Sequence, residues 1–406
     1  MKKNLNIGFI GIGGRGRGLL KSVVLESEGV TVIAVCDAYA DRAEEGAKYV
    51  VEAGQKEPFC TTNYKEVLEV EGLDAIFIAT DWTTHVPIAC EAMEKGIAVG
   101  MEVGGACALE ECWDLVNTYE RTGTPFMMLE NCCFGKREMM ALQMVKEGLF
   151  GEVVHCSGGY CHDLRTEVAD GKEKRHYRLR HYTCRNAENY PTHEIGPIAK
   201  LLHINTGNRM ISLTSTASKA AGLHEFIKNH RSDNEKLMNT VFNQGDIVST
   251  VIKCANGETI AITLDTTLPR YYSRGFTVRG TLGMYEEATD SVFLDREEDI
   301  KLDFTWRKER CGNAEEYEEK YLHPVWKKYI ADGVRGTHDG MDWLEFQTFF
   351  DCLRDNKPMP VDVYDAASWM CITTLSEQSI ATGSAPVAIP DFTRGKWVNR
   401  TRHEMF

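Results

Sequence analysis

The chain has 406 residues, 43% of them hydrophobic, and a formal net charge of −14. A chain of this length can bury more than one core, and at about 150 residues per domain it predicts two or three domains. Its negative charge disfavours nucleic acid and anionic membrane surfaces as partners, so small molecules or other proteins are expected.

The N-terminus and the cysteines favour a cytoplasmic location. The opening MKKNLNIGFIGIGG lacks the apolar core and the cleavage site of a secretion signal. No apolar run approaches the roughly 18 residues of a membrane span, so we expect no membrane contact. Fourteen cysteines without a secretion signal indicate reduced thiols, and their spacing predicts no metal site.

The first 130 residues alternate strand and helix patterns. Short β-branched or apolar runs predict strands, and amphipathic segments between them predict helices. This rhythm is typical of right-handed βαβ units and a parallel sheet. The predicted strands cover residues 5–11, 30–37, 73–80, 97–103 and 125–131.

Beyond Asn131 the pattern changes to strands that follow one another directly. Residues 150–164 alternate, residues 245–269 predict a hairpin turning at Asn256-Gly257, and residues 275–288 predict a further strand. Such an order favours an antiparallel sheet. We therefore predict an α/β Rossmann domain with a doubly wound parallel sheet over residues 1–131. An α+β domain with a large, mainly antiparallel sheet is expected over 132–406, with a late helix at about 364–383 that is free to pack back toward the first domain.

A dinucleotide signal follows the first predicted strand. Gly11, Gly13 and Gly16 form G-x-G-x-x-G at the mouth of a predicted helix, and Asp37 ends the second strand 21 residues after Gly16. Glycines let the backbone approach a pyrophosphate, the helix N-terminus offers free N–H groups, and a carboxylate accepts bonds from ribose hydroxyls. A carboxylate repels a 2′-phosphate, so Asp37 favours NAD over NADP, although Arg15 and Arg42 lie nearby.

Longer motifs carry a family resemblance. The opening IGFIGIGGRGRG and the block IATDWTTHVPIACEAMEKGIAVGMEV resemble the Gfo/Idh/MocA family of nicotinamide oxidoreductases. The segments LEECWDLVNTYERTGTPFMMLENCCFG, NYPTHEIGPIAKLLHINTGNRMISLTS, LDTTLPRYYSRGFTVRGT and HDGMDWL resemble one branch, the NAD-dependent α-N-acetylgalactosaminidases of glycoside hydrolase family 109. The likeness extends over nearly the whole chain.

This resemblance implies a glycosidase that works by redox chemistry on a small-molecule glycoside. NAD oxidises the sugar at C3, which acidifies the C2 proton; elimination expels the C1 substituent, water adds, and the hydride returns to C3. Tyr190 and His193 match the family's Tyr-Pro-Thr-His motif, and both proton transfers need a base. We assign His193 to the C3 hydroxyl and Tyr190 to the C2 side, although the two roles could be exchanged.

The same matching implies the remaining site residues. The positions that fall where the family contacts its sugar are Tyr160, His162, Arg178, Tyr272 and His338. The positions that fall at the cofactor are Gly11, Gly13, Gly14, Arg15, Gly16, Asp37, Trp82, His85, Glu102 and Asn131. For Trp82 and His85, a structural role at a helix start is an alternative.

Departures from the family pattern concern the sugar pocket. Gly104 replaces a proline, Glu194 replaces the glycine after the Tyr-Pro-Thr-His motif, and Thr337 and Asp339 replace glycines around His338. We expect these changes to crowd or charge the sugar pocket, Glu194 above all, so the sequence does not fix the sugar.

Two other functions stay open at the level of sequence. The first is a plain NAD-dependent dehydrogenase that releases a 3-keto sugar or glycoside, and the second is a sugar or NAD sensor without activity. The pair Tyr190 and His193 argues against a sensor. The sheet of the second domain suits a homo-oligomer.

Overall fold

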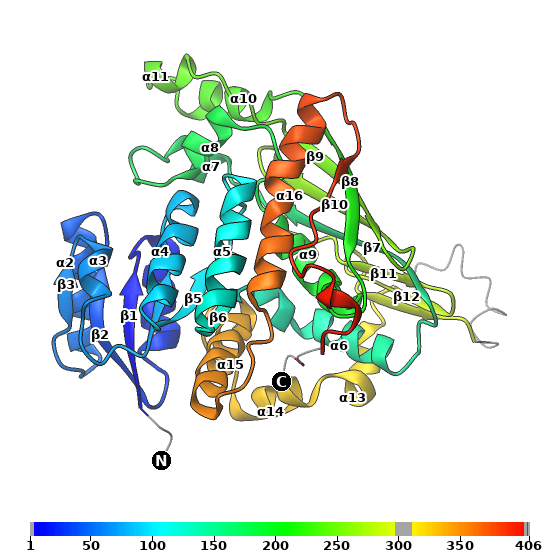
Figure 1. Ribbon diagram of the computed structural model, residues 1–406. Helices are drawn as coiled ribbons and strands as arrows, with labels where there is room; N and C mark the ends of the chain where they lie inside the picture. The colour runs from blue at the N-terminus through cyan, green and yellow to red at the C-terminus, as the bar shows by residue number, and fades with distance from the viewer. Residues whose placement is uncertain (1–3, 297–310, 402–403, 405–406) are drawn as a thin grey trace. The chain divides into compact units, whose positions relative to one another are not determined.

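The fold is described from a computed structural model for residues 4–296, 311–401 and 404. The chain divides into two compact units (Figure 1). Among the described residues, unit 1 contains 4–134, 329–367 and 404, and unit 2 contains 135–296, 311–328 and 368–401. The expected domain boundary between residues 131 and 132 stays a prediction.

Unit 1 is built on a six-stranded parallel sheet in the order β3-β2-β1-β4-β5-β6. This strand order belongs to the doubly wound dinucleotide-binding fold and confirms the predicted architecture. The edge strand β3 was not predicted, because its three half-exposed residues are too few for a recognisable alternation. The strands are β1 Leu5–Ile10, β2 Val30–Cys36, β3 Phe59–Thr61, β4 Ala75–Ile78, β5 Ala98–Glu102 and β6 Phe126–Leu129.

The helices of unit 1 join successive strands, as expected for βαβ units. Asp81 caps the helix after β4 by accepting the amide hydrogen of Thr83 at 2.9 Å. Gly123, with φ +66°, ends the helix after β5. The helices are α1 Gly14–Leu19, which continues as a π-helix over Leu20–Val24, α2 Ala40–Glu52, α3 Tyr64–Val67, α4 Trp82–Glu94 and α5 Leu109–Thr122.

A helix from late in the chain completes the core of unit 1. This helix is α15, Met341–Asp355. Its Phe346, Phe349 and Phe350 surround Phe77 of β4, with ring centroids 4.6, 5.1 and 5.8 Å away, respectively. All four rings are almost completely buried. The aromatic cluster therefore ties a segment of the second half of the sequence to the nucleotide-binding sheet.

Unit 2 contains an eight-stranded sheet in the order β13-β12-β11-β7-β10-β9-β8-β14 (Figure 1). The pairing is antiparallel except between β7 and β10, which confirms the mainly antiparallel prediction. The predicted hairpin is β9–β10, and Gly257 at its turn has φ +108°. The strands are β7 Val153–Cys161, β8 Met210–Ala217, β9 Ile247–Cys254, β10 Thr259–Asp265, β11 Thr277–Gly280, β12 Gly283–Glu286, β13 Ser291–Leu294 and β14 Val387–Ala388.

One helix of unit 2 lies against the middle of this sheet. It is α9, Pro191–Leu201, which packs on β7 and β10. Pro191 occupies the first helical position, where a missing N–H costs nothing, so the chain enters the helix directly after Tyr190. Other helices of this part are α6 Lys136–Lys146, α7 Arg165–Ala169, α8 Arg178–Cys184, α10 Gly222–His230, α11 Glu235–Met238 and α13 Glu318–Tyr321. The late helix α16, Val363–Ala381, begins in unit 1 and ends in unit 2.

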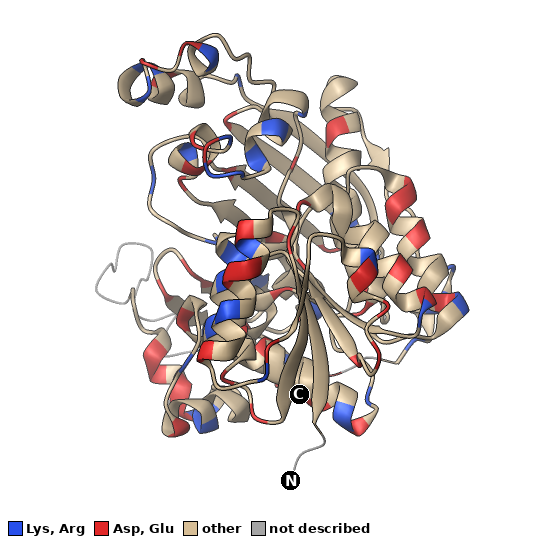
Figure 2. Ribbon diagram, turned by 90° about the vertical axis from the view of Figure 1, so that its left-hand side faces the viewer, with Lys and Arg blue, Asp and Glu red and all other residues tan. Residues whose placement is uncertain are grey.

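Charged side chains are distributed unevenly between the strands and the other parts of the fold. Figure 2 shows the charged residues mainly on helices and loops, whereas the strands carry few. All fourteen cysteines are free thiols. In the described part of the chain, no helix combines the length and the apolar character that crossing a membrane requires.

Candidate functional site

The turn after β1 is shaped for the close approach of another group. Gly11 has φ +101°, and a Cβ there would lie 2.4 Å from the Ala79 carbonyl oxygen. A Cβ at Gly16 would lie 1.9 Å from the Gly11 carbonyl oxygen, so neither position accepts a side chain. At Gly14 a Cβ would meet nothing within 4 Å, and Gly13 offers no side-chain cap to α1. Open space before uncapped amides fits the pyrophosphate of a dinucleotide.

Asp37 is fixed beside this turn. Its Oδ2 accepts the amide hydrogen of Ile12 at 2.7 Å, and its Oδ1 accepts that of Tyr39 at 2.9 Å. The residue is only 6% exposed. These two bonds hold the carboxylate directly after β2, the place from which such an acid binds a ribose.

A network of polar side chains connects four predicted site residues of unit 1. Arg15 donates from Nε to Glu102 Oε1 at 2.8 Å and forms two bonds to Asp342, from Nη1 at 2.7 Å and from Nη2 at 2.9 Å. Asn131 Nδ2 donates to Asp342 Oδ1 at 2.8 Å, and His338 Nδ1 lies 2.8 Å from Asp342 Oδ2. Asp342, at the start of α15, therefore joins Arg15, Asn131 and His338.

Asp342 carries a negative charge in this network. Burial alone would raise the pKa of its carboxyl group, but the hydrogen bond with His338 and the positive charge of Arg15 outweigh burial. The pKa of Asp342 is therefore held well below its usual range. Thr337 also donates a hydrogen bond to this carboxylate. His338, assigned by sequence to the sugar, lies in unit 1 as a member of this network.

Trp82 and His85 lie in the first turn of α4 and are both buried. His85 Nε2 lies 3.1 Å from the Thr80 carbonyl oxygen. Burial lowers the pKa of His85 to about 4, so its ring is neutral at pH 7. A cofactor role for Trp82 and His85 stays a prediction.

The predicted catalytic pair of unit 2 forms an aromatic cluster with a residue of β7. The rings of Tyr160 and Tyr190 have centroids 4.2 Å apart. The His193 ring stands perpendicular to that of Tyr190 at 4.9 Å and lies 5.5 Å from that of Tyr160. Because α9 packs on β7, residues distant in sequence meet around one point. Tyr190 is 8% exposed, and His193 is half-buried.

Three more of the predicted sugar contacts surround this cluster. Tyr160 Oη lies 3.2 Å from His162 Nδ1, and the Tyr272 ring lies 5.2 Å from that of His162. Arg178 is buried, and its guanidinium lies 4.8 Å from the centre of the Tyr190 ring. Burial opposes the charge of Arg178, but the neighbouring Tyr160 and Tyr177 phenols and the Glu167 carboxylate outweigh it and keep the pKa of Arg178 well above its usual value. The cluster thus combines phenols, imidazoles and a fixed positive charge.

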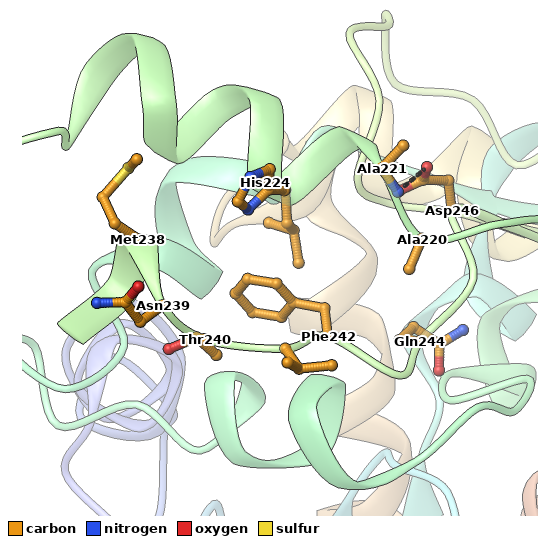
Figure 3. Close-up of a pocket in the computed structure, with 11 residues that line it drawn as sticks. Ala220, Ala221, His224, Met238, Asn239, Thr240, Phe242, Gln244 and Asp246 are labelled. Carbon is orange, nitrogen blue, oxygen red and sulfur yellow. Dashed lines mark hydrogen bonds between the residues drawn. The ribbon is translucent and has the colours of Figure 1, made fainter. Parts of the chain in front are cut away.

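A separate cavity of unit 2 does not have these features. It has a volume of about 300 Å³ and lies between α10, α11 and the segment 240–246 (Figure 3). Its buried Gln244 already bonds to Ala187 and Asn189, and its buried Asp246 bonds to Ala221, Gly222 and Thr267. Both side chains are engaged in hydrogen bonds within the protein. The aromatic cluster is therefore the better candidate for the site of chemistry.

Comparisons with known proteins agree with the features of each unit. Residues 134–399 match the family described as glycosyl hydrolase 109, C-terminal domain, and residues 5–129 match the oxidoreductase family with an NAD-binding Rossmann fold. An α-N-acetylgalactosaminidase of Tannerella forsythia is 40% identical over 419 residues, covering 98% of this chain and 88% of that protein. The chain belongs to glycoside hydrolase family 109.

Other relatives give the same assignment. A family 109 protein of Parabacteroides distasonis is 38% identical, covering 98% of the chain and 88% of that protein. A solved levoglucosan dehydrogenase in complex with NADH and levoglucosan has a TM-score of 0.69 at 18% identity, covering 96% of this chain and all of that one, and shows the fold. The chain is therefore an NAD-dependent glycosidase, and NAD, for which the glycine turn has room, is its cofactor.

Two departures of this family 109 member have structural explanations. At Gly104 a Cβ would lie 2.3 Å from Cδ1 of Trp82, so the buried indole fills the space that a proline ring would need. Glu194 is 1% exposed, and its carboxyl group faces that of Glu188. The expectation that Glu194 charges the sugar pocket is therefore wrong, because successive helix residues point about 100° apart and this one points into the core.

Three residues that contact predicted site residues were not predicted from the sequence. Asp342 lies within the motif HDGMDWL, Glu188 precedes Tyr190 by two positions, and Glu167 forms an ion pair with Arg178 at 2.6 Å. An acid close to a motif residue was the available signal. Acids are abundant in this chain, so that signal alone could not select these three.

Proposed function

We propose that this family 109 glycosidase cleaves its substrate by oxidation at C3, elimination across C1 and C2, water addition and re-reduction. The observation that carries the proposal is the cluster of Tyr160, Tyr190 and His193 in unit 2 of a chain whose other unit carries a dinucleotide turn. Bound NAD would supply the hydride acceptor and donor for the sugar C3. The turn from Gly11 to Gly16 would hold its pyrophosphate and Asp37 its ribose.

The proton transfers fall to Tyr190 and His193. His193 Nδ1 or Nε2 takes the proton of the C3 hydroxyl, and Tyr190 Oη takes the proton at C2. The opposite assignment also fits, because the centroids of the two rings are only 4.9 Å apart. The Arg178 guanidinium, 4.8 Å from the centre of the Tyr190 ring, places a fixed positive charge beside the proposed base. Tyr160, His162 and Tyr272 would orient the sugar.

The substrate class is proposed from relatives. The proteins of Tannerella forsythia and of Bacteroides fragilis, the latter 36% identical over 97% of this chain, are named α-N-acetylgalactosaminidases. We propose N-acetylgalactosaminides as the first glycosides to test. Buried Glu194 no longer argues against them.

Deuterium incorporation tests the mechanism. Turnover of a panel of aryl glycosides in deuterated water is expected to place deuterium at C2 of the released sugar while no NADH accumulates. A C2 proton becomes removable only when C3 carries a ketone, and hydrolysis by two carboxylates never breaks that bond. Sugar released without C2 deuterium would contradict elimination, and steady NADH formation would favour the plain dehydrogenase.

We also propose a cytoplasmic homo-oligomer. Fourteen free thiols support a reducing compartment. Val154, Ile211 and Val251, which belong to adjacent or nearby strands of the unit 2 sheet, are 48%, 38% and 50% exposed, which supports contact between copies through the sheet. Light scattering on the purified protein checks this, and a monomer at all concentrations would contradict it.

A further inference from the structure

Two glutamates flank the proposed catalytic pair within unit 2. Glu188 lies two residues before Tyr190, and Glu194 directly follows His193. The two side chains are among the most buried of the molecule, with exposed fractions of 0% and 1%. Burying two carboxylates is expensive unless they are paired with a cation or protonated.

Hydrogen bonds from neighbouring elements fix Glu188 in place. Glu188 donates its amide hydrogen to Ser376 Oγ at 2.8 Å and accepts from Thr373 Oγ1 at 2.7 Å, so α16 holds this residue from both sides. Its Oε1 accepts the amide hydrogen of Tyr190 at 3.3 Å. Glu194 lies in the first turn of α9. Glu188 therefore anchors the segment that leads into Tyr190, and Glu194 lies on the helix that carries His193.

The two carboxyl groups face each other. Within the described part of the chain, Glu188 Oε2 and both oxygens of Glu194 accept no hydrogen bond of normal geometry from another group. An acid pair satisfies such oxygens when one carboxyl group is protonated and donates to the other. The backbone amides of Tyr160 and Leu264 also lie near and favour the charged forms.

Among the described residues, the titratable groups that act on the pair from neighbouring elements supply no compensating charge. These are the Cys161 thiol of β7 and the Tyr182 phenol of α8. Burial raises the pKa of Cys161 to about 11 and also raises that of Tyr182, so both groups are neutral at pH 7. Burial raises the pKa values of Glu188 and Glu194, and each negative charge makes the second ionisation harder.

We propose that Glu188 and Glu194 share a proton as a buried acid pair that positions Tyr190 and His193. When the proton leaves to solvent, two carboxylates repel each other across the segment that carries the catalytic groups. Both glutamates are positioning residues. The inference rests on the proposed function for its link to catalysis, but not for the existence of the pair.

The sign of the pH effect follows from the direction of the shifts. A carboxyl group whose pKa is higher in the folded than in the unfolded chain favours folding fully below the unfolded value, about 4.3 for a glutamate. That contribution declines as pH rises through the folded value. The pair should therefore lower the melting temperature steadily as pH increases from about 5 to about 9.

Glutamine substitutions on the full-length, NAD-loaded protein test the pair. Glu194→Gln and Glu188→Gln each keep a hydrogen-bond donor without the charge, so we expect a flatter decline of melting temperature with pH than in the parent. Without the second ionisation, the loss of activity on the alkaline side should move up by about one pH unit. The ratio of glycosidase activity at about pH 9 to that at about pH 7 should therefore rise by about tenfold. Glu225→Gln, on the exposed surface of α10, is the matched control and should change neither.

Each outcome decides one point. If both glutamine variants keep the melting profile of the parent, no shared proton exists and the proposal is overturned. A flatter melting profile with an unchanged activity ratio would overturn the positioning role and leave the pair as a purely structural feature. If the protein shows no glycosidase activity at all, the proposed function fails, whereas the melting profiles still decide whether the acid pair exists.

Discussion

At the scale of single residues, Asp37 should decide which dinucleotide binds. Arg15 is engaged by Glu102 and Asp342, so it does not compensate for a 2′-phosphate beside Asp37. We expect cofactor-stripped protein to bind NAD at least about tenfold more tightly than NADP in titration calorimetry, because the carboxylate repels the extra phosphate.

A matched substitution separates charge from structure at this position. Asp37 also holds the amides of Ile12 and Tyr39, so removing it weakens the turn for either cofactor. Asp37→Asn keeps the shape and one acceptor, so the ratio of the two affinities reports the charge alone. We expect this ratio to fall toward one, and an unchanged ratio would remove Asp37 from the ribose site.

At the scale of elements, the end of β5 and the start of α4 leave no space at position 104. A methyl group on Gly104 would overlap the Trp82 indole, so Gly104→Ala should lower the free energy of unfolding by about 1–3 kcal/mol. Gly18→Ala, inside α1 with nothing within 4 Å, should instead raise it by about 0.5–1 kcal/mol. Urea denaturation measures both, and equal effects would contradict the packing argument.

The secondary-structure elements differ in how far the sequence predicts them. Period and glycine pattern predicted the parallel sheet and the β9–β10 hairpin, because these depend on neighbouring residues. The parallel pairing of β7 with β10 could not be read from the sequence, since it depends on contacts between strands about a hundred residues apart. Glu194 was misjudged for a related reason, because adjacency to His193 along the chain says little about where its side chain points.

At the scale of the whole molecule, the two units are expected to divide the work. The glycine turn and Asp37 belong to unit 1, whereas Tyr190 and His193 belong to unit 2. Under this division, a substitution in the aromatic cluster should stop chemistry without affecting the cofactor. The NAD-dependent rise in melting temperature and the rate of turnover would then respond to different residues.

His193→Ala gives this division a quantitative test. Loss of a positioned acid or base should slow turnover of an aryl glycoside by roughly 100-fold to 10,000-fold. Saturating NAD, at about 100 times its dissociation constant, stabilises the protein by about 2.7 kcal/mol, and this variant should keep that gain because His193 is not part of the dinucleotide turn. Asp37→Asn should show the reverse order of effects, with a reduced gain from NAD and turnover restored by more cofactor. If His193→Ala loses the stabilisation by NAD as well as activity, the two units do not act separately, and the assignment of chemistry to unit 2 alone is wrong.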